Sequence, residues 1–260
     1  MRKKFIRLAS QLAPKLITRF AYNQLTHPQV QKLRAHEIKM LDTAEKETVP
    51  FKTSLIQTYQ WKGGEQKVLL IHGWEGQAGN FADLIERLKA ENYTIYAFDA
   101  PSHGFSSKGK TSLFEFTEVV SMLIRKFDVA SLVSHSFGGV ATTYSLFKNP
   151  DLIIAKYVLL TTPDTFLERI DDVAFQIGIT EKVKQKLIQR LNDETGENAA
   201  GLSVHRLVQE ITIQEVLILH DINDRVIPIS QSQNVANHWK DAKMIEIEGT
   251  GHFRILRTDF

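Results

Sequence analysis

The order of apolar and polar positions along the chain predicts an alternation of strands and helices. Short apolar runs recur from residue 68 onward, and stretches of helix-like spacing lie among them. The runs are 68–71, 94–98, 132–133, 157–160, 216–219 and 244–247, and the helical stretches are 79–90, 112–127, 137–147 and 230–239. Strands that are apolar on both faces are typical of a parallel sheet covered by helices. We therefore expect a doubly wound α/β fold.

Two further segments complete this pattern. Residues 47–62 alternate as two short strands around Thr53 and Ser54, which brings the mostly parallel sheet to about eight strands. Residues 163–212 are rich in charge and in helix formers, with an amphipathic stretch at 182–191. A long insertion at the carboxyl end of a sheet is typical of a lid. We predict a helical cap at 163–212, inserted into a core made of 47–162 and 213–260.

Residues 1–46 form a basic segment with helical periodicity. Its apolar positions share one helical spacing and are Phe5, Leu8, Leu12, Leu16, Ile17 and Phe20. Such a stripe either packs on the body of the domain or contacts a membrane surface or a partner, and we favour packing on the domain. A secretory signal is not expected, because Gln11, Pro14 and Lys15 interrupt the apolar stretch and no cleavage site follows.

Composition narrows the class of protein. The chain has 260 residues, 43% hydrophobic and 24% charged, which is enough for one sizeable globular core. A net charge of +2 argues against a dedicated nucleic-acid binder. The chain has no cysteine, which excludes disulfides and thiolate chemistry, and no apolar run of about 18 residues that predicts a membrane span. We expect a cytoplasmic protein and leave a homodimer open.

Polar side chains follow the apolar runs at the places where parallel strands would end. Ser136 follows the third run, Asp224 the fifth and His252 the sixth. The carboxyl ends of parallel strands share one edge of a sheet, where active sites lie. His252 would take the proton of the Ser136 hydroxyl, and Asp224 would orient the imidazole. The sequence therefore predicts a Ser136–His252–Asp224 triad.

The residues around the serine predict its setting. Residues 134–139 read Ser-His-Ser-Phe-Gly-Gly between an apolar run and a helical stretch, as in a nucleophile elbow. The backbone N–H groups of Phe137 and Trp74 would form the oxyanion hole, with Gly73 letting the chain bend close to the substrate. The side chains of Trp74 and Phe137 either line an acyl pocket or only pack, and both interpretations stand equally.

These motifs together resemble the α/β-hydrolase family over about residues 50–253. The matching pieces are His72-Gly73, the Asp-Ala-Pro-Ser-His-Gly-Phe-Ser of 99–106, Ser136, Asp224 followed by Val-Ile-Pro, and Gly251-His252. The pattern is most similar to the capped esterase, lipase and acyl-transferase-like members, and the His-Gly-Gly-Gly signature of another subgroup is absent. The resemblance implies a serine hydrolase that acts on an ester without a cofactor.

The sequence departs from the family pattern at three places. Ser134 and Ser102 stand where the family has glycine. The chain also ends eight residues after His252, where members of the family continue with a helix. Either the sequence is shortened there, or the N-terminal helical segment covers that face of the sheet.

Several residues compete with these assignments. Asp221 and Asp164 also follow apolar runs, and we favour Asp224 as the acid because Val-Ile-Pro follows it closely. We expect structural roles for the other histidines at strand ends, which are His72, His103, His135 and His220. No histidine pair has the spacing of ligands on one helix face, so a metal site is not expected.

We therefore predict a serine hydrolase that cleaves a carboxylic ester or thioester through an acyl-enzyme. The substrate would be a small ester or acyl compound that enters between the sheet edge and the cap. Two alternatives remain: an inactive α/β-hydrolase fold that only binds, and the same triad used for acyl transfer, perhydrolysis or C–C bond hydrolysis. Haloalkane dehalogenase and epoxide hydrolase chemistry are disfavoured, because they need an aspartate nucleophile and position 136 is serine.

Overall fold

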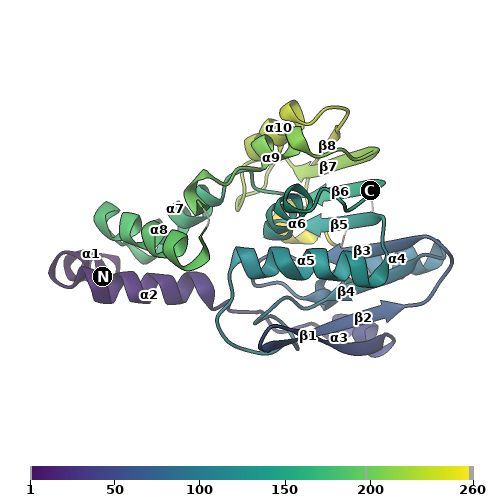
Figure 1. The fold of residues 1–260 in the computed structure, drawn as a ribbon, viewed down its shortest axis with the longest axis horizontal. Helices are drawn as coiled ribbons and strands as arrows, with labels where there is room; N and C mark the ends of the chain where they lie inside the picture. Colours follow the sequence, from purple (N-terminus) through teal and green to yellow (C-terminus); the bar gives the residue numbers. More distant parts are fainter. Residues whose placement is uncertain (1, 197, 258–260) are drawn as a thin grey trace.

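An eight-stranded sheet forms the centre of the computed structural model, which describes residues 2–196 and 198–257 (Figure 1). The strand order is β1-β2-β4-β3-β5-β6-β7-β8. The strands are β1 (Glu45–Phe51), β2 (Ser54–Trp61), β3 (Lys67–Ile71), β4 (Thr94–Phe98), β5 (Ser131–His135), β6 (Lys156–Leu160), β7 (Glu215–Asp221) and β8 (Lys243–Ile247). β1 and β2 pair antiparallel at one edge, and β3 to β8 run parallel. The predicted fold class is therefore confirmed.

Helices cover both faces of the sheet because its central strands are apolar on both faces. One face packs on α5 (Leu113–Phe127), α6 (Phe137–Lys148) and α10 (Ile229–His238). The other face packs on α4 (Ala82–Ala90), on the short 3-10 helix Ala78–Phe81 and on α3 (Ala35–Asp42). Alternate residues of β3 pack on opposite faces. Leu69 and Ile71 belong to the buried cluster on the α5–α6 face, and Val68 and Leu70 belong to the one on the α4 face.

The segment between β6 and β7 is helical, as its sequence predicted. It contains α7 (Phe166–Ile177), α8 (Glu181–Thr195) and the short α9 (Val204–Leu207). The amphipathic stretch expected at 182–191 lies within α8. Thr165 accepts a hydrogen bond from the backbone of Glu168 at the start of α7, and Gly178 ends this helix with φ +87°. That this insertion acts as a cap stays a prediction.

The N-terminal helices α1 (Arg2–Leu12) and α2 (Pro14–Thr26) differ from the expectation. They pack against α7 and α8 rather than on the sheet, and the four helices form a lobe at one end of the molecule (Figure 1). We call these four helices the helical lobe. Only the second half of α2, with Ala21, Tyr22 and Leu25, joins the main core. The expectation that the whole segment packs on the domain body is therefore wrong for α1.

The part of the N-terminal segment that does cover the sheet is α3. Leu41 of α3 belongs to the same buried cluster as Ile255 and Leu256, which follow the short α11 (Gly251–Arg254). Glu37 of α3 is buried and lies 3.5 Å from the guanidinium of Arg257. Thus α3 and the residues after His252 pack together on the α4 face, as one of the two sequence alternatives proposed.

Candidate active site

Ser136 lies on a strained turn between β5 and α6. Its backbone has φ +52° and ψ −125°, a conformation that side chains other than glycine rarely adopt. Strained backbone of this kind is typical of functional sites. The second and third residues after Ser136 must be small: a Cβ on Gly138 would lie 2.5 Å from the carbonyl oxygen of His72, and one on Gly139 would lie 2.2 Å from Oγ1 of Thr162.

The serine that replaces the family's glycine at position 134 fits without displacing the turn. Ser134 is fully buried, and its hydroxyl lies 2.8 Å from the hydroxyl of Tyr157 on the neighbouring strand β6. The hydrogen bond satisfies both buried groups. The close approach of strand and helix therefore depends on Gly138 and Gly139, and Ser134 is compatible with it.

The three residues of the predicted triad converge at this edge of the sheet. The Ser136 Oγ lies 3.0 Å from Nε2 of His252, and Nδ1 of His252 lies 2.8 Å from Oδ2 of Asp224. The other carboxylate oxygen of Asp224 accepts the backbone N–H groups of Val226 and Ile227 at 2.7 and 3.0 Å. A serine, an imidazole and a carboxylate in this order can deprotonate the hydroxyl.

Asp224 is held as a carboxylate. Burial alone raises the pKa of this carboxyl, but hydrogen bonds from His220 and His252 and from the backbone of Ile227 lower it well below the usual value. An acid beside an imidazole must be ionised to stabilise the imidazolium. The backbone N–H groups of Val226 and Ile227 bind this carboxylate, which is why the Val-Ile-Pro sequence helps to identify Asp224 as the acid.

The competing acids have different partners. Asp221 accepts the backbone N–H of Asn223 on one oxygen, and on the other the N–H groups of Thr250 and Gly251 and the Thr250 hydroxyl. These bonds fix the turn that precedes His252. Asp164 lies at the base of the insertion, where it accepts from Ser203, His205 and Asn234.

Two neutral histidines shape the loop after β3. The N–H of Ala100 donates to Nε2 of His72, so the proton of this ring is on Nδ1 and is donated to the carbonyl of Gly73. Burial lowers the pKa of His72 to about 4. Nε2 of His103 accepts the N–H of Glu75 in the same way, and burial lowers its pKa also. These bonds hold the predicted oxyanion loop in place.

The backbone donors expected in the oxyanion hole are available. Within the described residues, the N–H groups of Trp74 and Phe137 donate no hydrogen bond. Phe137 begins α6, where the first N–H groups of a helix have no partner inside it. Gly73 lies against the elbow, because a Cβ there would be 3.1 Å from the Cβ of Ser136.

His135 and His220 support the catalytic loops from behind. The ring of His135 bonds through Nε2 to the backbone carbonyl of His252 at 2.8 Å, and burial lowers its pKa to about 3. His220 bonds to the carbonyl of Ile227 in the loop after Asp224 and to the hydroxyl of Ser232 in α10. Ser102, at φ +69°, is held by two hydrogen bonds with Gly109.

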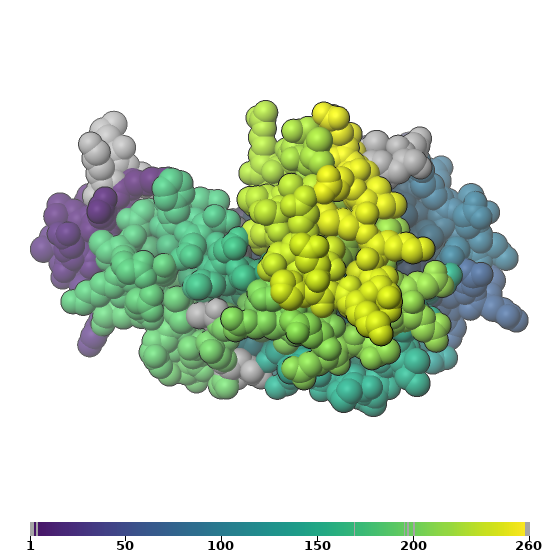
Figure 2. Space-filling model, turned by 90° about the horizontal axis from the view of Figure 1, so that it is seen from above, coloured from purple at the N-terminus to yellow at the C-terminus, as the bar shows by residue number. Residues whose placement is uncertain are grey.

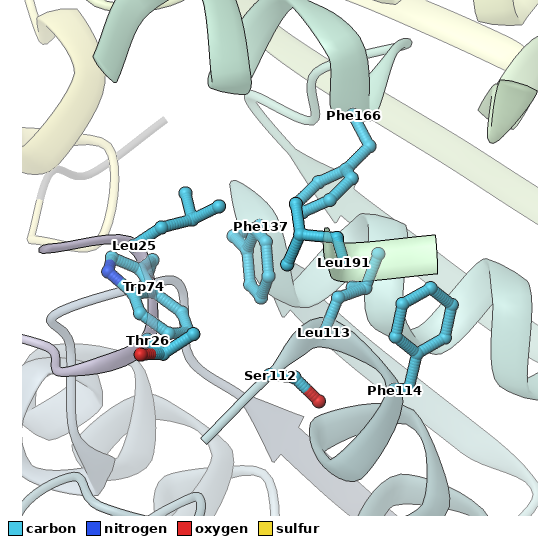
Figure 3. Close-up of a pocket in the computed structure, with 9 residues that line it drawn as sticks. All are labelled: Leu25, Thr26, Trp74, Ser112, Leu113, Phe114, Phe137, Phe166 and Leu191. Carbon is cyan, nitrogen blue, oxygen red and sulfur yellow. The ribbon is translucent and has the colours of Figure 1, made fainter. Parts of the chain in front are cut away.

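An apolar pocket lies beside the oxyanion loop (Figure 3). Its lining comes from α2, the loop after β3, α5, α6, α7 and α8 and consists of Leu25, Thr26, Trp74, Ser112, Leu113, Phe114, Phe137, Phe166 and Leu191. The rings of Trp74 and Phe137 contact edge to face with centroids 5.2 Å apart. The free space is ≈ 20 Å³, about the room of one water molecule. The sequence left open whether these two side chains face a pocket, and they do.

A second pocket opens directly onto the nucleophile. This catalytic pocket has a volume of ≈ 410 Å³ and is lined by Ser136, His252 and Trp74 on one side. Its other side carries Lys32 and Arg34 from the segment before α3 and Arg257 after α11. The sequence pattern did not predict that residues 31–37 line this pocket. They lie about a hundred positions before Ser136 in the chain, and no local pattern relates the two segments.

Within residues 2–196 and 198–257, no group of three or more histidine or carboxylate side chains is arranged to hold a metal ion. Over the same residues, no helix has the length and apolar character needed to cross a bilayer.

A doubly wound sheet with a serine, a histidine and an aspartate at its carboxyl edge defines the α/β-hydrolase class. The model of the alpha/beta hydrolase family matches residues 68–259, and the chain belongs to this family. A pimeloyl-[acyl-carrier protein] methyl ester esterase of Xylella fastidiosa (strain 9a5c) is 28% identical over 152 residues, which are 55% of this chain and 58% of that protein. The relative of the same name from Xanthomonas campestris pv. campestris (strain B100) is 33% identical over 96 residues, 37% of either chain.

Solved structures share the fold at low sequence identity. A bacterial membrane phospholipase A aligns with a TM-score of 0.64 and 16% identity over 95% of this chain and 88% of the other. The thioesterase domain of the curacin biosynthetic pathway aligns with a TM-score of 0.59 and 18% identity over 80% and 93%. At such identities the likeness concerns the fold alone.

Proposed function

We propose that this protein is a serine hydrolase that cleaves a carboxylic ester or thioester through an acyl-enzyme. The observation that carries the proposal is the continuous relay from Ser136 through His252 to Asp224, with hydrogen-bond distances of 3.0 and 2.8 Å. The esterase names of the relatives from Xylella and Xanthomonas support the same bond type.

The reaction follows from the positions of these groups. His252 takes the proton of the Ser136 hydroxyl as its oxygen attacks the carbonyl carbon, and the N–H groups of Trp74 and Phe137 bind the oxyanion. The imidazolium then donates the proton to the departing alcohol or thiol, which leaves the acyl group on Ser136. Water, deprotonated by His252, releases the acid and restores the hydroxyl.

The two pockets give the substrate a direction. The leaving group must lie near His252, because this ring protonates it, and His252 lines the catalytic pocket with Lys32 and Arg34. The acyl chain extends the other way, past Trp74 toward the apolar pocket, whose side chains must move apart to admit it because the free space there is only ≈ 20 Å³. The proposed substrate is therefore an apolar acyl group joined to a polar leaving group, since the pocket around His252 is lined by the basic Lys32 and Arg34 and also by the acidic Glu37 and Glu75.

A fluorophosphonate probe tests the proposal. The wild-type protein is expected to be labelled at Ser136, and Ser136→Ala is expected to remain unlabelled, because only an activated serine reacts with the probe. Ser134→Ala is the matched control: this buried neighbour does not face the relay, so labelling persists. A folded wild-type protein that takes no label would leave only a binding role for the fold.

A second measurement separates ester hydrolysis from other uses of the same triad. p-Nitrophenyl esters of increasing acyl length should release the acid with water as the only acceptor. Product that appears only after addition of an acceptor alcohol would indicate acyl transfer. The preferred acyl length would also report the depth of the apolar pocket once it is occupied.

A further inference from the structure

The outer face of α1 carries a stripe of exposed apolar side chains. Phe5, Leu8 and Leu12 are 72%, 55% and 79% exposed, and Leu16 near the start of α2 is 67% exposed. At 3.6 residues per turn, the three α1 positions lie within an arc of about 60°. The opposite side of α1 is buried, with Ile6 at 8% and Ser10 at 2% exposure. The helix therefore packs by one side and presents an unpartnered apolar stripe on the other.

Basic residues dominate the same segment. Residues 1–36 contain eight of the chain's 32 lysines and arginines and no aspartate or glutamate. The remaining residues hold 24 basic against all 30 acidic side chains. Arg7, Lys15 and Arg19 are exposed, and no ion pair with a described residue neutralises any of them. The segment is thus a cationic and apolar surface on a chain whose remainder is net negative.

The helical lobe extends this surface. α7 adds Phe175, which is 76% exposed, and the ammonium of Lys3 lies 4.1 Å from the centre of its ring. In Figure 2 the α1–α2 segment forms one end of the molecule, beside α7 and α8. An exposed aromatic residue close to a lysine is typical of side chains that enter a lipid headgroup layer.

We propose that the outer face of α1 and the start of α2 bind the surface of an anionic lipid bilayer. A helix with an apolar stripe, flanking lysines and arginines and no acidic residue is suited to lie in the plane of such a surface. Charge complementarity favours this occupant over a second copy of the chain, because two copies of a segment with eight basic residues and no acidic residue would repel each other. This proposal is independent of the proposed esterase activity.

The location of the surface also connects it with the apolar pocket. The far end of α2 supplies Leu25 and Thr26 to the lining of that pocket, and the carbonyl of Thr26 accepts the backbone N–H of Thr111. A bilayer that binds α1 would therefore contact the same helical unit whose other end closes on Trp74. Bilayer binding itself does not require the proposed esterase activity; the delivery of an acyl chain from the lipid layer toward this pocket rests on that activity.

Vesicle co-sedimentation of the full-length protein tests the proposal. Vesicles of phosphatidylcholine with about a third phosphatidylglycerol are expected to bind the protein, more weakly as salt rises, and pure phosphatidylcholine is not. The variant Leu8→Asp/Leu12→Asp is expected to lose affinity at least tenfold, since both leucines would enter the lipid layer. Lys15→Glu/Arg19→Glu should lose about as much affinity for the anionic vesicles, because each basic residue near the surface raises that affinity about fivefold.

Ile153→Asp is the matched control. Ile153 is 84% exposed in the loop before β6, at the edge of the sheet opposite the site, and its variant should bind vesicles like the wild type. Thermal unfolding shows whether each variant is folded. Absence of wild-type binding to anionic vesicles would overturn the proposal. So would unchanged binding of Leu8→Asp/Leu12→Asp, or a wild-type dimer that this variant dissociates while vesicles bind neither form.

Discussion

The carboxyl edge of the sheet and the helical lobe use their polar residues in opposite ways. At the sheet edge the two aspartates are buried and hydrogen-bonded on both carboxylate oxygens: Asp221 accepts four hydrogen bonds, and Asp224 accepts from two backbone groups and from His252. On the lobe, Phe5 and Leu12 face solvent while charged side chains form exposed pairs. The edge is built to fix a geometry, whereas the lobe is built to contact something outside the molecule.

Apolar packing joins the two regions, because Phe166 and Leu191 of the lobe belong to the same buried cluster as Phe137, and a few polar contacts add to it. One polar contact is made by Glu194 at the end of α8. Its carboxylate accepts hydrogen bonds from Tyr22 and Arg190 within the lobe, and from Lys110 in the loop before α5. Another is Asp164, which binds Ser203 and the backbone of His205 and so ties the start of the insertion to its end.

The largest expected effect is the difference in activity between substitutions of Asp224 and of Asp221, the two aspartates at the sheet edge. Asp224→Asn should lower kcat about 10³–10⁴-fold on a p-nitrophenyl ester, because the amide cannot stabilise the imidazolium, and it should also lose stability as the bonds from Val226 and Ile227 weaken. Asp221→Asn should lower the free energy of unfolding by about 2 kcal/mol with a much smaller loss of kcat, since it weakens charge-assisted bonds to Thr250 and Gly251 but does not contact His252. Kinetics and urea unfolding of both variants check this, and an equal kcat loss in the two would refute the assignment of the acid.

A change of pH should affect the two regions differently. His135 and His72 are buried at the sheet edge, with pKa values lowered from 6.5 to about 3 and about 4, and no histidine lies in α1, α2, α7 or α8. A lowered histidine pKa gives stability that is present above pH 6.5 and is lost as the pH falls toward the folded value, because the unfolded chain binds the proton more tightly.

We therefore expect each of these histidines to remove about 2 kcal/mol of stability between pH 7 and pH 5. His135→Gln keeps a donor for the carbonyl of His252 but cannot titrate, so its unfolding free energy should depend less on pH. Urea unfolding at the two pH values measures the difference. A variant whose pH dependence equals that of the wild type would show that His135 contributes nothing to it.

The sequence predicted the sheet edge far better than the lobe. The apolar runs specify buried strands, and strand ends converge, so the positions of Ser136, Asp224 and His252 follow from local pattern and topology. The bonds of Asp221 to Thr250 and Gly251 did not follow, because they join two loops 29 and 30 positions apart that no periodicity relates. The packing of α1 was mispredicted, since an amphipathic stripe does not say which surface it meets.

The smallest expected effect concerns the junction at Glu194. Glu194→Gln removes the charge that Lys110 and Arg190 share, and because the side chain is one-third exposed we expect a loss of at most about 1 kcal/mol. The lobe should open more often, so proteolysis within 163–212 should become faster, while hydrolysis of p-nitrophenyl acetate stays within about twofold of the wild type. Glu181→Gln is the control, because Glu181 is 66% exposed and pairs with Lys184 of its own helix. If Glu194→Gln slowed the acetate reaction as much as it loosened the insertion, the relay would depend on the lobe, and the separation of the two regions would be wrong.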